Sequence, residues 1–161
     1  MATQEDSELY KGRGNTKFIW DLDNLSQLYA VVEHLTRRYG EQLLHEAGVD
    51  SIDPDQELII LDEAGGTGAV AAALMDVLGD EAKGKMDLTL VDMALAMIDL
   101  INKRVKANEW QNIKVVQADA ADSKLPSSHF THLFLNFGPF IFADPQVGLG
   151  EMYRVLGLAG R

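Results

Sequence analysis

The chain has 161 residues, of which 47% are hydrophobic and 24% are charged, and this composition is typical of one folded domain with its own core. The 25 acidic and 14 basic residues give a net charge of −11, which disfavours binding to nucleic acid or to an anionic membrane surface. Disulfides and thiolate metal sites are excluded because there is no cysteine, and since the histidines do not pair at ligand spacing we expect no metal.

Residues 1–17 are polar, contain Gly12 and Gly14 and show no apolar period, so we expect a flexible N-terminal arm. The first eight residues lack the apolar segment of a secretory signal. No later run reaches the roughly 20 apolar residues that span a membrane. We therefore expect a cytoplasmic protein.

Residues 18–50 are predicted to form a helical cap. Their apolar side chains recur at helical spacing along one face, which we expect to be buried, and the segment forms either one helix or two helices divided at Gly40. The apolar positions are Leu25, Leu28, Val32, Leu35, Tyr39, Leu43 and Leu44.

The stretch from residue 58 to residue 78 predicts a strand, a turn and a helix. The apolar run 58–61 is typical of a strand that is buried on both faces, and an alanine-rich helix is expected over 69–78. Asp62 and a run of small residues lie between them: Ala64, Gly65, Gly66 and Gly68. Small residues let the backbone approach a ligand closely, and the turn aims the first N–H groups of the helix at that ligand.

The same unit then repeats along the chain. A strand over 88–91 ends in Asp92 and precedes a helix over 93–108, a strand over 113–118 ends in Asp119, and a fourth strand over 130–136 leads to a helix over 146–156. A turn is expected at 83–85. Strands that alternate with helices predict an α/β fold, Rossmann-like, with a doubly wound parallel sheet and right-handed crossovers. Ligands of such sheets bind beyond the carboxyl ends of the strands.

Three aspartates stand at these strand ends. Asp92 is placed to accept the hydroxyl groups of a bound ribose, which is compatible with NAD or with S-adenosylmethionine. Asp62 would repel the pyrophosphate of NAD, whereas it favours a ligand with an amino group and a sulfonium. Asp119 can accept from an exocyclic amine such as that of adenine. A single strand-end aspartate often only caps a turn, but three at equivalent positions favour a ligand.

Residues from about 57 to 161 resemble a class I S-adenosylmethionine-dependent methyltransferase. The resemblance rests on five segments in the family's order: 61–68, 90–93, 117–120, 125–134 and 151–156. It is nearest to small-molecule methyltransferases of the ubiquinone-biosynthesis type and their fungal natural-product relatives. It implies that residues 51–161 are an S-adenosylmethionine-binding domain with strands in the order third, second, first, fourth. The fifth to seventh strands of the family would be missing.

The resemblance also implies which residues hold the cofactor. Asp62 and the turn formed by Ala64, Gly65, Gly66 and Gly68 would hold its methionine part. Asp92 would bind the ribose and Met93 would contact one face of the adenine. The adenine edge would meet Asp119 and Ala120, and Asn136 and Phe137 would border the transferred methyl group. No catalytic residue is implied. Ala64 replaces the first glycine of the family's turn, which we expect to be a mild change.

The function that we expect is methyl transfer to a small, apolar molecule such as a natural product. Two alternatives remain: an accessory or heteromeric subunit with a methyltransferase fold, and a cyclase or isomerase that transfers no methyl. An NAD-linked oxidoreductase is the weakest reading. The fourth strand would leave an apolar edge with Phe130, Phe134 and Leu135, which predicts a homodimer or a heteromer.

Overall fold

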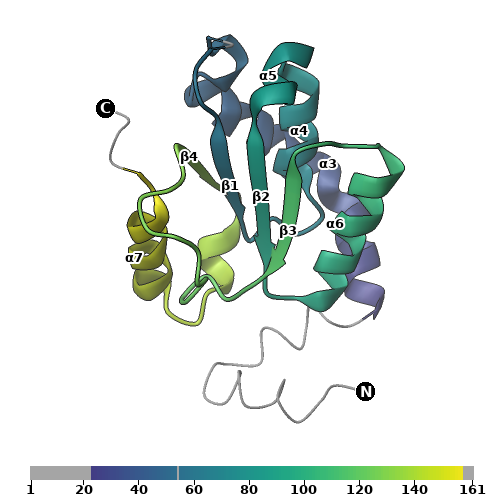
Figure 1. The fold of residues 1–161 in the computed structure, drawn as a ribbon. Helices are drawn as coiled ribbons and strands as arrows, with labels where there is room; N and C mark the ends of the chain where they lie inside the picture. Colours follow the sequence, from purple (N-terminus) through teal and green to yellow (C-terminus); the bar gives the residue numbers. More distant parts are fainter. Residues whose placement is uncertain (1–22, 54, 158–161) are drawn as a thin grey trace.

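A computed structural model describes residues 23–53 and 55–157, so the expected arm at 1–17 lies outside the described residues. The strands β1 (Ile59–Glu63), β2 (Asp87–Asp92), β3 (Ile113–Gln117) and β4 (His132–Leu135) form one parallel sheet. Their order is β3-β2-β1-β4 (Figure 1), which confirms the predicted topology. From β1 the chain adds β2 and β3 on one side of the sheet and then β4 on the other side, so the strand order reverses at β1. Doubly wound sheets bind ligands at such a point.

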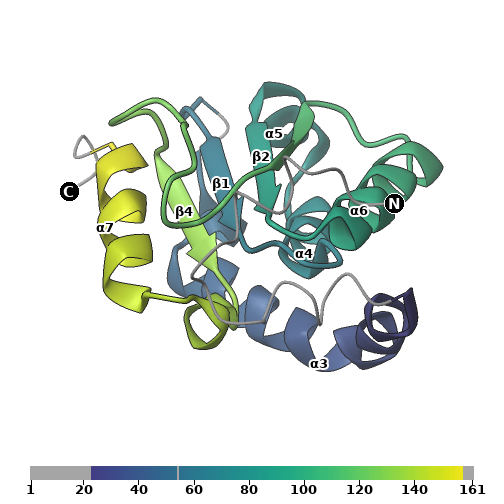
Figure 2. The same cartoon turned by 90° about the horizontal axis from the view of Figure 1, so that it is seen from below.

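The helices lie on both faces of this sheet (Figure 2). Helices α4 (Ala69–Val77) and α6 (Leu95–Ala107) belong to the two crossovers and share one face, and α7 (Pro145–Val155) covers the other. Since successive side chains of a strand point to opposite faces, Ile60 packs with α4, and Leu61 packs on the α7 side. By the same alternation, the carboxyl of Asp62 faces α4 and that of Glu63 faces α7.

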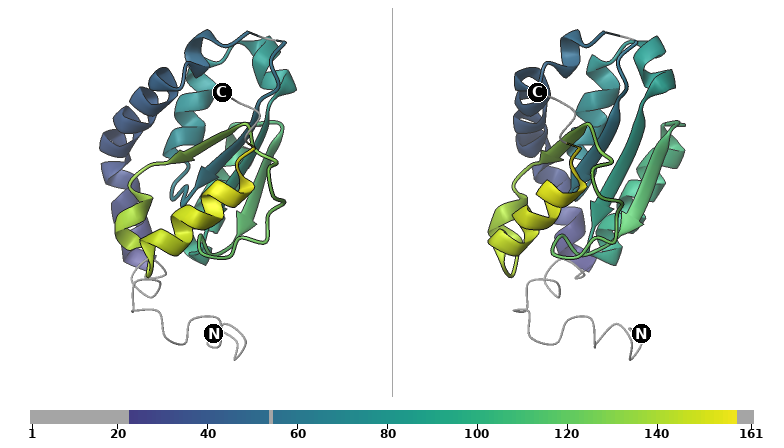
Figure 3. Two further views of the ribbon diagram at one scale, coloured as in Figure 1. Left: turned by 90° about the vertical axis from the view of Figure 1, so that its left-hand side faces the viewer. Right: turned by 60° about the vertical axis from the view of Figure 1, so that its left-hand side comes forward.

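Helix α3 (Asp23–Glu46) is continuous, so of the two alternatives the single helix is confirmed and the division at Gly40 is wrong. Gly40 is buried where α3 lies beside α4 (Figure 3), and a Cβ at this position would lie 3.3 Å from Cγ2 of Val70. The glycine therefore allows close packing of the two helices rather than a break. The predicted buried face is also wrong in part, because Leu35 and Tyr39 are exposed although Leu44 is fully buried.

Two further segments differ from expectation. The turn predicted at 83–85 is the end of a short helix, α5 (Asp80–Lys85), whose acidic first turn and basic last turn suit the helix dipole. Strand β4 is shorter than predicted, and Phe130 forms a parallel bridge with Leu156 instead. Short 3-10 helices occur at η1 (Val49–Ser51) and η2 (Gly138–Ile141). None of the helices in the described ranges is long and apolar enough to cross a membrane.

Candidate functional site

The turn between β1 and α4 lies tightly against β2. Gly66 and Gly68 have φ angles of 56° and 78°, which glycine adopts without steric penalty. The N–H of Gly65 donates to the carbonyl of Val91 at 2.9 Å. A Cβ on Gly65 would lie 2.9 Å from Cδ2 of Leu90, so this position has no room for a side chain.

Ala64 also adopts the left-handed conformation, with a φ of 54°. A non-glycine residue in this region costs about 1–3 kcal/mol of backbone strain. The replacement of the family's first glycine by Ala64 is therefore less mild than the sequence led us to expect.

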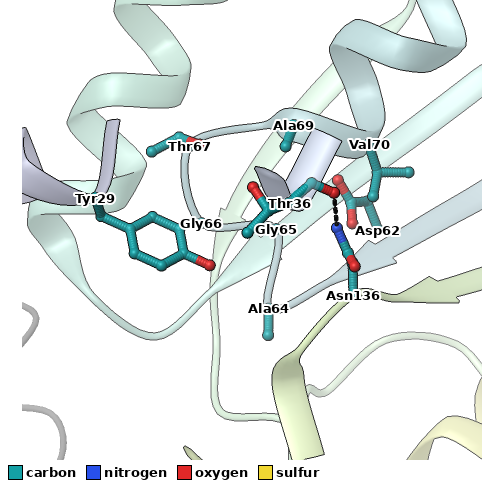
Figure 4. Close-up of a pocket in the computed structure, with 10 residues that line it drawn as sticks. All are labelled: Tyr29, Thr36, Asp62, Ala64, Gly65, Gly66, Thr67, Ala69, Val70 and Asn136. Carbon is teal, nitrogen blue, oxygen red and sulfur yellow. Dashed lines mark hydrogen bonds between the residues drawn. The ribbon is translucent and has the colours of Figure 1, made fainter. Parts of the chain in front are cut away.

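A small cavity lies where the turn meets α3 and the end of β4 (Figure 4), and the space in it open to the centre of a water-sized sphere is about 20 Å³. Figure 4 shows Asp62 and Asn136 on one side of the turn and Tyr29 of α3 on the other. Five of the residues that the sequence singled out line this cavity: Asp62, Ala64, Gly65, Gly66 and Asn136. The sequence did not indicate Tyr29, Thr36 and Thr67, which also line it. Gly68 is the N-cap of α4 and completes the turn.

The carboxyl of Asp62 is the most unusual group of the cavity wall. The residue is 1% exposed, and among the described residues neither carboxyl oxygen accepts a hydrogen bond of normal geometry, the backbone of Ala71 acting on it only weakly. Burial raises the pKa of Asp62 to about 8, with smaller contributions from the charges of Glu63 and Asp92 and a still smaller opposing one from the backbone of Ala71. The side chain is therefore largely protonated at neutral pH, and a cationic donor in the cavity would favour its ionised form.

Glu63 is a second buried carboxyl in the same strand, and the sequence analysis had assigned it no role. It is 2% exposed, and burial raises its pKa to about 8. In the sequence, the only sign of this second buried carboxyl is that two consecutive acidic residues end an apolar strand.

Thr67 adds a hydroxyl group without a partner to the cavity wall. The residue is 5% exposed and its Oγ1 makes no hydrogen bond, whereas its carbonyl accepts from Nη1 of Arg104 at 3.0 Å. A buried carboxyl and a buried hydroxyl without partners suit a ligand that carries both an ammonium group and a hydrogen-bond acceptor.

Of the other aspartates predicted for the site, Asp92 is the last residue of β2 and Asp119 lies just beyond the end of β3, and neither lines this cavity. Oδ2 of Asp92 accepts from the N–H of Gly66 at 2.9 Å, and its Oδ1 accepts from the N–H of Ala94 at 2.9 Å. Oδ1 of Asp119 accepts from the N–H of Ala121 at 2.9 Å. Both aspartates thus stabilise turns. Met93 and Ala120, which follow them in the chain, are half-buried.

Asn136 connects the end of β4 to α3. Its side-chain Nδ2 donates to the carbonyl of Thr36 at 2.8 Å (Figure 4). The next residue, Phe137, has a φ of 63° and packs edge-on against Tyr39, with ring centres 5.1 Å apart. Neither of these two rings lines the cavity itself. Within residues 23–53 and 55–157, no group of three or more acidic or histidine side chains is placed to hold a metal ion.

Comparison with known proteins agrees with this fold and shows the family. The model of the ubiE/COQ5 methyltransferase family matches residues 29–161. Methyltransferase tpcH of Aspergillus fumigatus is 33% identical over 132 residues, which are 82% of this chain and 46% of the relative. The acetylaranotin bis-thiomethyltransferase of Aspergillus terreus is 37% identical over 109 residues, which are 68% of this chain and 39% of the relative.

Among solved structures, a Methanococcus maripaludis protein assigned as an S-adenosyl-L-methionine-dependent methyltransferase superposes with a TM-score of 0.67 at 18% identity. The superposition covers 85% of this chain and 58% of that one. The fold is therefore the Rossmann-like fold of such methyltransferases. The chain belongs to the ubiE/COQ5 methyltransferase family. It spans less than half the length of the two fungal relatives that it matches.

Proposed function

We propose that the chain binds S-adenosylmethionine and takes part in methyl transfer to a small, apolar molecule such as a fungal natural product. One observation carries this proposal: the buried carboxyl of Asp62 lies without a hydrogen-bond partner in a cavity beside the glycine turn. A buried carboxyl in this state is costly unless a ligand supplies a donor. The ammonium group of the methionine part supplies one, and its charge favours the ionised carboxylate.

The other cavity groups fit the same ligand end. The hydroxyl of Thr67 can donate to the ligand's carboxylate, and the left-handed Gly66 and Gly68 let the backbone approach it closely. Beyond the cavity, we assign the ribose hydroxyls to Asp92. We assign one adenine face to Met93, and the adenine edge to Asp119 and Ala120 at the end of β3.

Bound S-adenosylmethionine would supply an electrophilic methyl group on its sulfonium. The chain's own residues would then act mainly by holding the two reactants in line and by excluding water. We place the acceptor near Asn136, which lines the cavity, and the exposed Phe137 that follows it in the chain. Displacement at a sulfonium demands no particular base, so we assign no catalytic residue.

We further propose that another polypeptide segment pairs with the outer side of β4, from a second copy of the chain or from a different subunit. β4 is an edge strand among the described residues, and an unpaired edge is a template for strand addition. Analytical ultracentrifugation tests this, because a stable monomer at micromolar concentration would contradict it. The cytoplasmic location remains a prediction from the sequence.

The transfer itself is tested by incubating the protein with S-adenosylmethionine and a panel of small apolar phenols and thiols. We expect a product that is heavier by one CH₂ unit, and no such product with Asp62→Asn. Asp99→Asn is the matched control, because it removes the same charge from an exposed position on α6. An acceptor that reacts without gaining mass would instead favour a cyclase or isomerase.

A further inference from the structure

Arg104 lies on α6 and does not line the cavity, yet it contacts two segments that do. Its Nη1 donates to Oε1 of Glu33 on α3 at 2.7 Å and to the carbonyl of Thr67 at 3.0 Å. The carbon of its guanidinium group lies 5.5 Å from the ring centre of Trp110. The side chains of Arg104 and Glu33 are 24% and 16% exposed, so this ion pair is shielded from water far more than an ordinary surface pair.

A single nitrogen atom makes both hydrogen bonds. The guanidinium group is planar, so the two protons on Nη1 point in fixed directions, one to Glu33 and one to Thr67. The ring of Trp110 lies over one face of the guanidinium group and limits its rotation. Arg104 therefore fixes the carbonyl of Thr67 relative to α3 with a precision that a lysine ammonium would not give.

The turn has a specific need for this contact. Glycines lose more conformational entropy on ordering than other residues, and this turn contains three of them within four positions. Its first part is fixed by the bonds of Gly65 to Val91 and of Gly66 to Asp92. The bond from Arg104 fixes its second part at the carbonyl of Thr67, a residue that lines the cavity.

We propose that Arg104, oriented by Glu33, is a positioning residue that preorganises Thr67 for the amino-acid end of S-adenosylmethionine. This inference rests on the proposed function. Arg104 touches no ligand and acts through the turn, which it holds in the binding geometry before the ligand arrives. A preordered site avoids an ordering cost that would otherwise be subtracted from the affinity.

Two ligands that differ only in the amino-acid end test this role. S-adenosylhomocysteine has that end and methylthioadenosine lacks it. For Arg104→Met we expect the Kd of S-adenosylhomocysteine to rise about tenfold, a change of about 1.4 kcal/mol. The Kd of methylthioadenosine should stay within about twofold, since that ligand does not reach Thr67. Titration calorimetry measures both constants on the same preparation.

Three more variants make the test specific. Arg104→Lys should show an intermediate effect, and Glu33→Gln a smaller one, because each keeps part of the bridge. The matched control is Arg37→Met, which breaks the ion pair between α3 and Asp76 of α4 without touching the turn, and it should change neither constant. If Arg104→Met does not fold, the lysine and glutamine variants carry the comparison.

The ratio of the two dissociation constants decides the outcome. An equal loss of affinity for both ligands would show a general structural role and would overturn the inference, as would unchanged affinity for both. A wild-type protein that binds neither ligand would overturn the proposed function, and the inference with it. Wild-type binding with an unchanged ratio in the variants would overturn the inference alone.

Discussion

Replacement of Asp62 by asparagine is expected to stabilise the unliganded protein as the pH rises. The folded-state pKa of Asp62 is raised from 3.8 to about 8, so between these values the unfolded carboxyl ionises while the folded one keeps its proton. The unfolded state then binds fewer protons, and the free energy of unfolding falls as the pH rises. Each pKa unit is worth about 1.4 kcal/mol, so the step from pH 5 to pH 7 costs the wild type up to about 3 kcal/mol through this one group.

In Asp62→Asn the new side chain has nearly the same shape as that of aspartate but does not titrate, so the fall in the free energy of unfolding between pH 5 and pH 7 should be absent. Urea unfolding at pH 5 and pH 7 should show the difference between variant and wild type growing by up to about 3 kcal/mol in favour of the variant. The exposed Asp99→Asn serves as the control and should show no such growth. A difference that is the same at both pH values would refute the reasoning, since Asp62 would then titrate normally in the folded protein.

Three further predictions concern the glycine turn, the ion pair of Glu151 with Arg154, and the pH dependence of ligand binding. Gly65→Ala should lower the free energy of unfolding by about 1–3 kcal/mol, because its Cβ would lie 2.9 Å from Leu90, whereas Gly79→Ala, which meets nothing within 4 Å, should have little effect in thermal unfolding. Hydrogen bonds from Arg154 lower the pKa of Glu151 to about 2, so the stability that this carboxylate provides is complete above the unfolded value of 4.5 and is lost as the pH falls towards 2. Glu151→Gln should therefore cost about 2 kcal/mol at pH 7 and almost nothing near pH 2, as measured by urea unfolding. The affinity for S-adenosylhomocysteine, measured by calorimetry, should rise from pH 6 to pH 8, because Asp62 ionises over this range while the ligand's amino group keeps its proton; a flat profile from pH 6 to pH 8 would argue against a charged pair at Asp62.

The sheet was predictable because each strand carries an apolar run that ends at a polar or small residue. The glycine turn was predictable for a similar reason, since only glycine adopts the φ angles of Gly66 and Gly68 without strain. By contrast, the packing of α3 against the rest of the fold was not predictable. A helical period indicates an apolar face but not the neighbour that it meets, and Gly40 proved to be a packing position against Val70.

The candidate site was predictable in its residues more than in its chemistry. Asp62 follows the first strand, so its place at the sheet edge could be read from the sequence. Its lack of hydrogen-bond partners could not, because that depends on how α3 and the turn close around it. Thr67, Tyr29 and Arg104 likewise enter through packing between segments that are distant in the chain. The strain at Ala64 required the observed φ angle.

The central claim is that the cavity beside Asp62 receives the amino-acid end of S-adenosylmethionine. Titration calorimetry with S-adenosylhomocysteine at pH 8, on the wild type and on Asp62→Asn, tests it most directly. The account predicts one site per chain with a Kd on the order of micromolar in the wild type, and a loss of at least about tenfold in the variant. Binding that is equally tight in both proteins, or absent from the wild type at millimolar ligand, would contradict it.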